Sequence, residues 1–126
     1  MPTILVMDDD PVIQKLLSVN FEMEGYRVVT AGDGVEGLGR VAAEPPDLIL
    51  LDVMMPRMDG IEVLRHLKAD GATAAIPVLM LSAKAQATDI SGGLDAGADD
   101  YITKPFDPLE LLDKVAALIG LAEAPS

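Results

Sequence analysis

Five side chains that could take part in metal or phosphate chemistry each stand at the end of a predicted strand, and most of these strands are short apolar runs. The five side chains are Asp8, Asp9, Asp52, Ser82 and Lys104. Runs of this kind are typical of strands buried on both faces of a parallel sheet. In open α/β sheets, ligands bind beyond the carboxyl ends of the strands. We therefore expect the five side chains to meet at one edge of a sheet.

The residue types define the chemistry of this predicted site. Asp8, Asp9 and Asp52 would repel one another without a counter-charge, and a set of oxygen ligands suits Mg²⁺ or Mn²⁺. Ser82 can donate a hydrogen bond to a phosphoryl oxygen, and Lys104 can neutralise another. In that setting Asp52 is a nucleophile that accepts a phosphoryl group. A single Asp after a strand is usually a turn residue, so the joint occurrence at four strand ends carries the prediction.

The rest of the chain alternates between strand and helix signals. We predict strands at residues 3–7, 26–31, 48–51, 76–81 and 100–103, and helices that begin near residues 11, 35, 60, 84 and 108. Alternation with short loops implies parallel strands joined by right-handed crossovers. The predicted fold class is α/β, a flavodoxin-like, doubly wound sheet of five parallel strands in the order 2-1-3-4-5 with helices on both faces. This order makes the first and third strands neighbours.

The last two predicted helices differ in quality. Residues 84–96 make a poor helix, because Gly92 and Gly93 each cost about 1 kcal/mol relative to alanine. Such an element is easily shifted by phosphorylation. The final helix has an apolar stripe that we predict to be buried, made of Leu109, Leu112, Val115, Ala116 and Ile119. We expect one domain over residues 1–120, with 121–126 as a tail or the start of a linker.

Composition excludes several classes of function. The chain has 126 residues, a formal net charge of −12 and no cysteine. The charge argues against direct binding to nucleic acid or anionic membranes, and favours Mg²⁺ or cationic partners. The absence of cysteine excludes disulfides and fits the cytoplasm. The apolar runs are too short to span a bilayer, and acidic residues interrupt the first one, so we expect neither membrane insertion nor a signal peptide.

The sequence resembles the receiver domain of two-component response regulators, a family of chemotaxis-regulator-like signalling domains. The resemblance extends from about residue 3 to residue 118. It rests on four segments in the family's order and spacing: ILVMDDDP at 4–11, LLDVMMPRMDG at 50–60, LSAK at 81–84 and GADDYITKPF at 97–106. This combination implies a phosphorelay switch and not a metabolic enzyme.

The resemblance also implies a role for each site residue. Asp52 takes a phosphoryl group from a phosphohistidine on a sensor histidine kinase or a histidine phosphotransfer protein. Asp9, Asp52 and the backbone carbonyl of Met54 bind the metal directly, whereas Asp8 acts largely through water. Lys104 pairs with the phosphoryl group, and the peptide bond between Lys104 and Pro105 is expected to be cis.

The same resemblance implies how the signal leaves the site. Ser82 moves to hold the phosphoryl group, and Tyr101 turns inward as Ser82 moves. The output surface, which meets a downstream effector, is the face formed by the fourth helix, the fifth strand and the last helix. Met54 and Lys84 flank the water that hydrolyses the acyl phosphate. Since neither is suited to activating that water, we expect the phosphorylated state to last minutes or more.

Two other classes of function compete with this interpretation. One is a Mg²⁺-dependent phosphohydrolase with an aspartyl-phosphate intermediate. Enzymes similar to the haloacid dehalogenases carry a second Asp two residues after the nucleophile, where this chain has Met54. Turnover of a phosphate ester would favour this alternative.

The other alternative is a nucleotide-binding module built on the glycine turn Gly32-Asp33-Gly34-Val35-Glu36-Gly37. This motif follows the second predicted strand instead of the first, and its acidic residues would face a pyrophosphate. Saturable binding of NADH would favour it. His66 is the only histidine, and we expect it to lie on the surface without a catalytic role.

Overall fold

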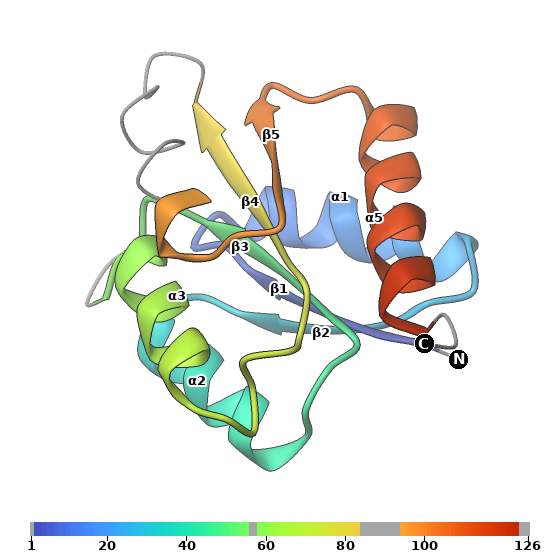
Figure 1. The fold of residues 1–126 in the computed structure, drawn as a ribbon. Helices are drawn as coiled ribbons and strands as arrows, with labels where there is room; N and C mark the ends of the chain where they lie inside the picture. The colour runs from blue at the N-terminus through green and yellow to red at the C-terminus, as the bar shows by residue number, and fades with distance from the viewer. Residues whose placement is uncertain (1, 56–57, 84–93, 124–126) are drawn as a thin grey trace.

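Five parallel strands form a single sheet in the predicted order β2-β1-β3-β4-β5 (Figure 1). The structure is a computed structural model that describes residues 2–55, 58–83 and 94–123. Its strands are β1 (Thr3–Met7), β2 (Arg27–Ala31), β3 (Leu48–Asp52), β4 (Val78–Ala83) and β5 (Asp100–Lys104). Its helices are α1 (Pro11–Met23), α2 (Gly34–Ala43), α3 (Gly60–Ala69) and α5 (Pro108–Glu123). The predicted helix 84–96 lies outside the described residues except for a helical stretch at 94–96.

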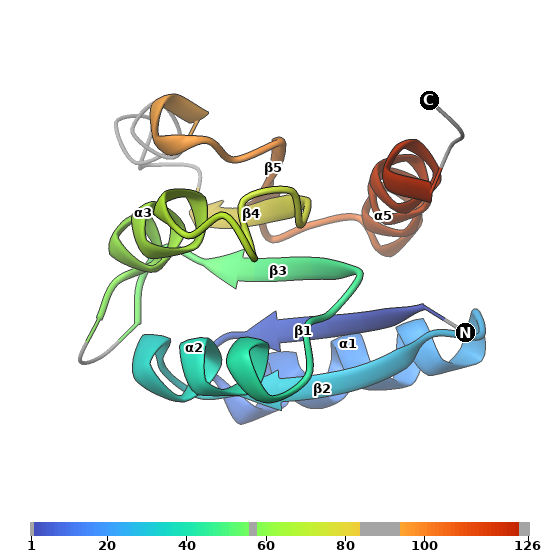
Figure 2. The same cartoon turned by 60° about the horizontal axis from the view of Figure 1, so that its bottom comes forward.

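The sheet separates two hydrophobic cores, because successive side chains of a strand point to opposite faces. Figure 2 shows α2 and α3 on one face of the sheet, and α1 and α5 on the other. In β1, Leu5 and Met7 pack towards α2 and α3, whereas Ile4 and Val6 pack towards α1 and α5. All residues of β1 and β3 are buried. The continuous apolar runs of the sequence therefore correspond to strands covered on both faces.

Aspartates fix where three of the helices begin. Asp10, Asp33 and Asp59 are the N-cap residues of α1, α2 and α3, and each accepts a backbone hydrogen bond from the first turn. A cap of this kind stabilises a helix by about 1 kcal/mol. Gly25 follows the end of α1 with a positive φ of 90°. Capping thus sets the short loops that connect the strand ends to the helices.

The predicted buried stripe of α5 is confirmed at Val115 and Ile119, and Leu112 packs partly buried against the core, but the other two positions differ. Leu109 is 70% exposed and Ala116 is also exposed, while the buried positions of this helix are Leu111, Val115 and Ile119. These three follow a spacing of four residues, so the helix is rotated relative to the predicted orientation. Two strand starts also differ, since β2 begins at Arg27 and β4 at Val78.

Three glycines allow the helices on one face to approach their neighbours closely. A Cβ on Gly37 would lie 2.3 Å from the Met7 sulfur, and one on Gly34 would lie 2.6 Å from Val63. A Cβ on Gly60 would lie 2.4 Å from the backbone oxygen of Asp52. The contact at Gly60 is with backbone atoms and leaves no space for a side chain, so α3 sits directly against the end of β3. At Gly37 the neighbour is the flexible side chain of Met7, so α2 packs closely against β1. Among the helices that the structure describes, none has the length and hydrophobicity needed to cross a membrane.

Candidate functional site

Three carboxylates meet at the carboxyl ends of β1 and β3, which are neighbours in the sheet (Figure 1). Asp8 and Asp9 follow β1, and Asp52 is the last residue of β3. One carboxylate oxygen from each of the three lies within 4.8 Å of the others. Asp8 is fully buried and Asp52 is 5% exposed, while Asp9 is exposed. The predicted acidic site is therefore present in the fold.

Lys104 reaches this cluster from the end of β5. Its Nζ donates to Asp8 Oδ2 at 2.8 Å and to Asp52 Oδ2 at 3.2 Å. Ser82 is buried in β4, where it pairs in register with Thr103 of β5. The structure thus brings a hydroxyl and a cation from two further strands to the same edge of the sheet. All five residues predicted from the strand ends lie at this edge.

The electrostatics of the cluster raise the pKa of Asp52 to about 6 from the ordinary value of 3.8. Burial is the main cause, and the negative charge of Asp8 adds to it. Lys104 and the backbone N–H of Met54, which donates to Asp52 Oδ1 at 3.2 Å, oppose the rise. Burial lowers the pKa of Lys104, but the hydrogen bond to Asp8 and the charges of Asp52 and Asp8 together raise it. The site therefore holds more negative charge than Lys104 compensates.

This imbalance predicts an unusual pH dependence of stability for the protein in a chelating buffer. Asp52 gives up its proton at higher pH in the folded chain than in the unfolded chain. The free energy of unfolding therefore falls as the pH rises from about 4 to about 7. The difference between about 6 and 3.8 corresponds to roughly 3 kcal/mol. Asp52→Asn is therefore expected to be more stable than the wild type by roughly 2 to 3 kcal/mol at pH 8, and nearly equal to it at pH 4.

Urea unfolding across this pH range measures the difference between the two proteins. Asp113→Asn, which changes an exposed carboxylate on α5, is the matched control and should show no such trend. A difference between Asp52→Asn and the wild type that stays constant from pH 4 to pH 8 would contradict the prediction.

The donor set suits a hard divalent cation. Asp8, Asp9 and Asp52 offer carboxylate oxygens only, as Mg²⁺ and Mn²⁺ prefer. Two of these carboxylates are buried beside a single lysine, and a divalent cation would balance their remaining charge. The exposed Asp9 leaves the cluster open to solvent on one side. The residues present therefore fit a metal that also binds phosphoryl oxygens.

One residue near the site was not indicated by the sequence. Gln14, in the first turns of α1, donates from Nε2 to the backbone carbonyl of Asp8 at 2.5 Å. A polar side chain in the first turns of a surface helix is usually solvated. The sequence pattern of α1 therefore does not single out Gln14. Its position relative to the turn after β1 becomes visible only once α1 is docked on the sheet.

A family model described as the response regulator receiver domain matches residues 4–116. The chain belongs to this family. Receiver domains are the signalling switches of two-component systems, so the resemblance noted in the sequence is confirmed at this level. The five-stranded fold is likewise that of solved receiver domains.

Relatives and solved structures agree with this assignment. The chain is 52% identical to the DNA-binding dual master transcriptional regulator RpaA of Synechocystis, over 94% of this chain and 49% of that protein. It is 49% identical to the alkaline phosphatase synthesis transcriptional regulatory protein PhoP of Bacillus subtilis, over 98% of this chain and 51% of that protein. The chain therefore spans about half the length of these relatives.

Two solved structures show the same fold. The receiver domain of a histidine kinase from Syntrophus aciditrophicus has a TM-score of 0.93 at 32% identity, and the alignment covers 100% of this chain and 96% of that one. The receiver domain of the Francisella response regulator 1452 has a TM-score of 0.89 at 36% identity, with 98% and 100% covered. Since the names of two relatives refer to DNA binding, the expectation that this receiver domain binds no nucleic acid stays a prediction.

Among the remaining predicted residues of the receiver domain, the structure describes Met54, Tyr101 and Pro105. Met54 is 60% exposed and Tyr101, on β5, is 37% exposed, so the tyrosine ring is not buried inside the domain. The Lys104–Pro105 peptide bond is cis, the isomer that the resemblance implies. Lys84 lies outside the described residues.

The glycine motif of the receiver domain is a helix cap and a packing contact. Asp33 accepts a hydrogen bond from the backbone N–H of Glu36, and the Glu36 carboxylate accepts one from the N–H of Gly32. These reciprocal bonds occupy the acidic groups and the turn. The third glycine, Gly37, packs against Met7. The motif is thus explained without a nucleotide.

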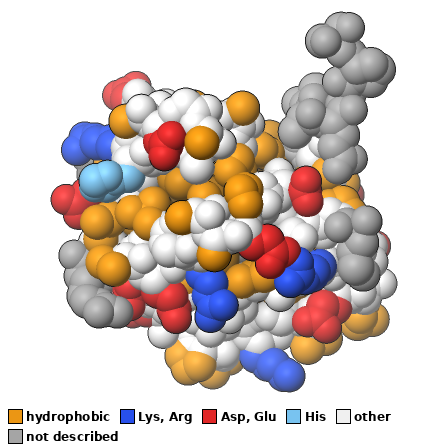
Figure 3. Space-filling view, turned by 90° about the horizontal axis from the view of Figure 1, so that it is seen from below, with side chains coloured by type: hydrophobic (Ala, Val, Ile, Leu, Met, Phe, Trp, Pro, Cys, Tyr) orange, Lys and Arg blue, Asp and Glu red, His pale blue; other side chains and the backbone are white. Residues whose placement is uncertain are grey.

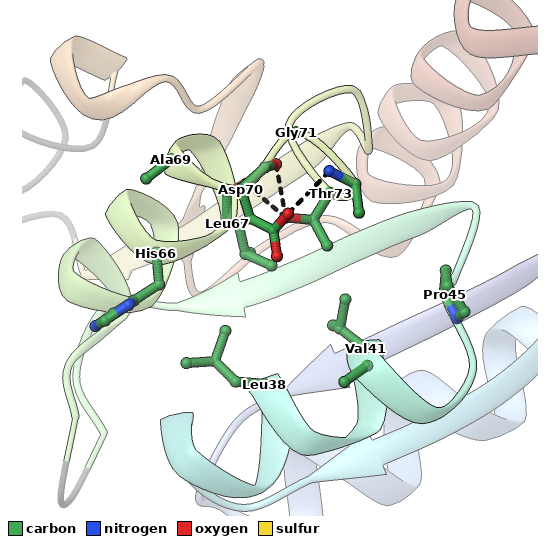
Figure 4. Close-up of a pocket in the computed structure, with 11 residues that line it drawn as sticks. Leu38, Val41, Pro45, His66, Leu67, Ala69, Asp70, Gly71 and Thr73 are labelled. Atoms are coloured by element: carbon green, nitrogen blue, oxygen red, sulfur yellow. Dashed lines mark hydrogen bonds between the residues drawn. The ribbon is translucent and has the colours of Figure 1, made fainter.

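A separate hollow of about 820 Å³ lies between the ends of α2 and α3, away from the carboxyl ends of the strands (Figure 4). His66, exposed as predicted, lines it together with Leu38 and Val41. Figure 3 shows hydrophobic side chains gathered at this end of the molecule, with charged ones scattered around them. The polar groups of its wall serve the turn after α3, where the Thr73 hydroxyl donates to the carbonyl of Leu67 at 2.6 Å. The hollow contains none of the predicted site residues.

Proposed function

We propose that Asp52 accepts a phosphoryl group from a phosphohistidine on a sensor histidine kinase or a histidine phosphotransfer protein, with Mg²⁺ or Mn²⁺ as cofactor. The observation that carries the proposal is the juxtaposition of a buried Asp52 with Asp8, Asp9 and Lys104 at one edge of the sheet. The cellular setting that goes with such a donor is the cytoplasm. The relatives named as regulators support the same class of function.

Each residue of the cluster has a task in the transfer. A carboxylate oxygen of Asp52 forms a bond to phosphorus while the bond from phosphorus to the donor's histidine nitrogen breaks, and the electron pair stays with the imidazole. Lys104 already lies 3.2 Å from Asp52 and neutralises charge that develops on the phosphoryl oxygens. Ser82 donates a hydrogen bond to one of these oxygens. Asp9, Asp52 and the carbonyl of Met54 would hold the cation, and Asp8 would act on it largely through water. When bound, the cation would supply further positive charge at the phosphoryl group.

The output of the switch is proposed to leave through β5 and α5, together with the predicted helix 84–96. Ser82 and Tyr101 lie on the paired strands β4 and β5. A movement of Ser82 would therefore displace Tyr101 through this strand pair. Tyr101 is 37% exposed, and its inward turn is part of the proposed switch. A downstream effector that contacts this surface would then respond to phosphorylation.

The phosphorylated state is expected to last minutes or more. Met54 is exposed two residues after Asp52 and cannot orient an attacking water by hydrogen bonding. Lys84 is proposed to flank the same water, and a charged lysine cannot activate that water as a general base. A chase of the radiolabelled phosphoprotein measures the half-life, and Met54→Gln, which adds an amide beside the acyl phosphate, should shorten it. Loss of label within seconds from the wild type would refute the prediction.

The phosphohydrolase alternative has less support. It requires a second acid two residues after the nucleophile, and Met54 occupies that position. The receiver family, to which the chain belongs, consists of switches.

Intact mass after incubation with acetyl phosphate and Mg²⁺ tests the proposed function. We expect a gain of about 80 Da, corresponding to one phosphoryl group on a carboxylate nucleophile. Asp52→Asn and a chelated sample are the controls, and neither should gain mass. No adduct together with no binding of Mg²⁺ would refute the proposal, and so would an adduct that persists in Asp52→Asn.

A further inference from the structure

We propose that Gln14 is a positioning residue, whose side-chain amide presets the turn that carries Asp8 and Asp9 for binding of the cation. The inference rests on the proposed function, because the cation matters here only as a partner in phosphoryl transfer. Gln14 touches neither the phosphoryl group nor the nucleophile. It acts through the backbone of the turn between β1 and α1.

The geometry places the amide at the end of two strands. Gln14 Nε2 lies 2.5 Å from the carbonyl oxygen of Asp8, which is the first residue after β1. It also lies 3.5 Å from the carbonyl oxygen of Ala31, the last residue of β2. The N–H of Asp8 donates to the same Ala31 oxygen at 3.1 Å. One side chain of α1 thus links the turn to the edge of the sheet.

The turn depends on such a link because Asp9 has no fixed side-chain contact. Within the part of the chain that the structure describes, the exposed Asp9 carboxylate makes no hydrogen bond or ion pair. Its position is therefore set by the two peptide units beside it. The carbonyl of the preceding unit accepts from Gln14, and the N–H of the following unit, that of Asp10, donates to Asp8 Oδ1 at 2.9 Å.

These two bonds are not equivalent for cation binding. Asp8 is itself one of the acidic residues, so its carboxylate is shared between the backbone and the cation. The amide of Gln14 carries no charge, and its NH₂ group donates to backbone carbonyls. It therefore holds the turn in the same way whether or not a cation is bound. Loss of an outer partner of this kind typically weakens metal binding by a factor of about 10 to 100.

The test measures binding of Mn²⁺ by the electron paramagnetic resonance signal of the free ion. Gln14→Leu and Gln14→Met both remove the donors, and the methionine variant keeps the length of the side chain. We expect each to raise the dissociation constant for Mn²⁺ about tenfold. Asn20→Leu is the matched control, because Asn20 also donates to a carbonyl on α1, that of Leu16, at 2.8 Å. It should leave the dissociation constant unchanged.

A second readout separates positioning from general damage to the fold. With acetyl phosphate as donor, the Mg²⁺ concentration for half-maximal phosphorylation should rise by the same factor in both Gln14 variants, with little change in the rate at saturating Mg²⁺. An unchanged dissociation constant in both variants overturns the inference, as does an equal weakening in Asn20→Leu. If the wild type neither accepts a phosphoryl group nor binds the cation, the proposed function fails. If the wild type does both and the Gln14 variants bind Mn²⁺ normally, only this inference fails.

Discussion

Lys104→Met is expected to slow phosphoryl acceptance by Asp52 about a hundredfold or more, and to destabilise the metal-free protein by about 3 kcal/mol at pH 8. The lysine is the cation that contacts Asp8 and Asp52 in the described part of the chain. Methionine keeps most of the apolar stem but removes the charge. Two buried carboxylates then lie side by side without a compensating positive charge. The resulting loss of stability is larger than the net stabilisation from an ordinary ion pair.

The same electrostatics give the stability effect a pH dependence. Lys104 holds the pKa of Asp52 down, so its removal raises that pKa above about 6. Asp52 of the variant is then protonated at pH values where Asp52 of the wild type is charged. The stability deficit should narrow as the pH falls towards 4. Mg²⁺ should restore part of the stability at pH 8, because it compensates the same carboxylates.

Lys114→Met is the matched control for Lys104→Met. Both lysine side chains are 27% exposed, and Lys114 also donates to an aspartate, Asp100, at 3.0 Å. The aspartates differ, since the Asp100 side chain is 37% exposed while those of Asp8 and Asp52 are 0% and 8% exposed. We expect Lys114→Met to cost less than about 1 kcal/mol and to leave phosphorylation intact. Equal effects of the two substitutions, in urea unfolding and in the rate of mass gain, would contradict the argument.

Gly60→Ala is expected to destabilise the protein by about 3 kcal/mol or more and to impair phosphorylation as well. The added Cβ would lie 2.4 Å from the carbonyl oxygen of Asp52 and 2.8 Å from the Cα of Val53. These neighbours are backbone atoms at the end of the central strand β3, and they cannot move aside as a flexible side chain can. Either α3 shifts away from β3 or the end of β3 shifts, and the second response displaces Asp52.

Gly39→Ala, in α2, separates this steric effect from the general effect of replacing glycine. A Cβ there meets nothing within 4 Å, so we expect a gain in stability of about 0.5 to 1 kcal/mol from the better helix propensity of alanine. Urea unfolding of both variants measures the contrast in sign. If the free energy of unfolding of Gly60→Ala lies within about 1 kcal/mol of the wild-type value, the close approach of α3 to β3 is not a constraint on the fold.

The acidic site could be predicted from the sequence because apolar runs define strand ends sharply. A buried parallel strand must be apolar along its whole length, so the first charged residue after it marks the edge where ligands bind. Asp8 and Asp52 follow from this rule once the strand order is known. Lys104 rests on less, because β5 is only partly buried and begins with Asp100, so its end is not marked by an apolar run.

Features that depend on how the elements dock could not be predicted. The last helix contains leucines at 109, 111 and 112, which allow two apolar stripes, and its rotation on the sheet selects the one with Leu111. The contact between Gln14 and Asp8 exists only because α1 packs beside the end of β1. The contact between Gly37 and Met7 likewise depends on the distance between a helix and a strand. None of these distances is encoded in a local pattern.

The close contact of α3 with β3 also provides a natural spectroscopic probe. The N–H of Gly60 donates to the carbonyl of Val53 at 2.8 Å, one residue after Asp52. Glycine amides fall in a sparsely populated region of a proton–nitrogen correlation spectrum, and this chain has 11 glycines and no tryptophan for fluorescence. The amide resonance of Gly60 should therefore shift when Asp52 is phosphorylated or binds a cation. No engineered reporter is needed to detect this change.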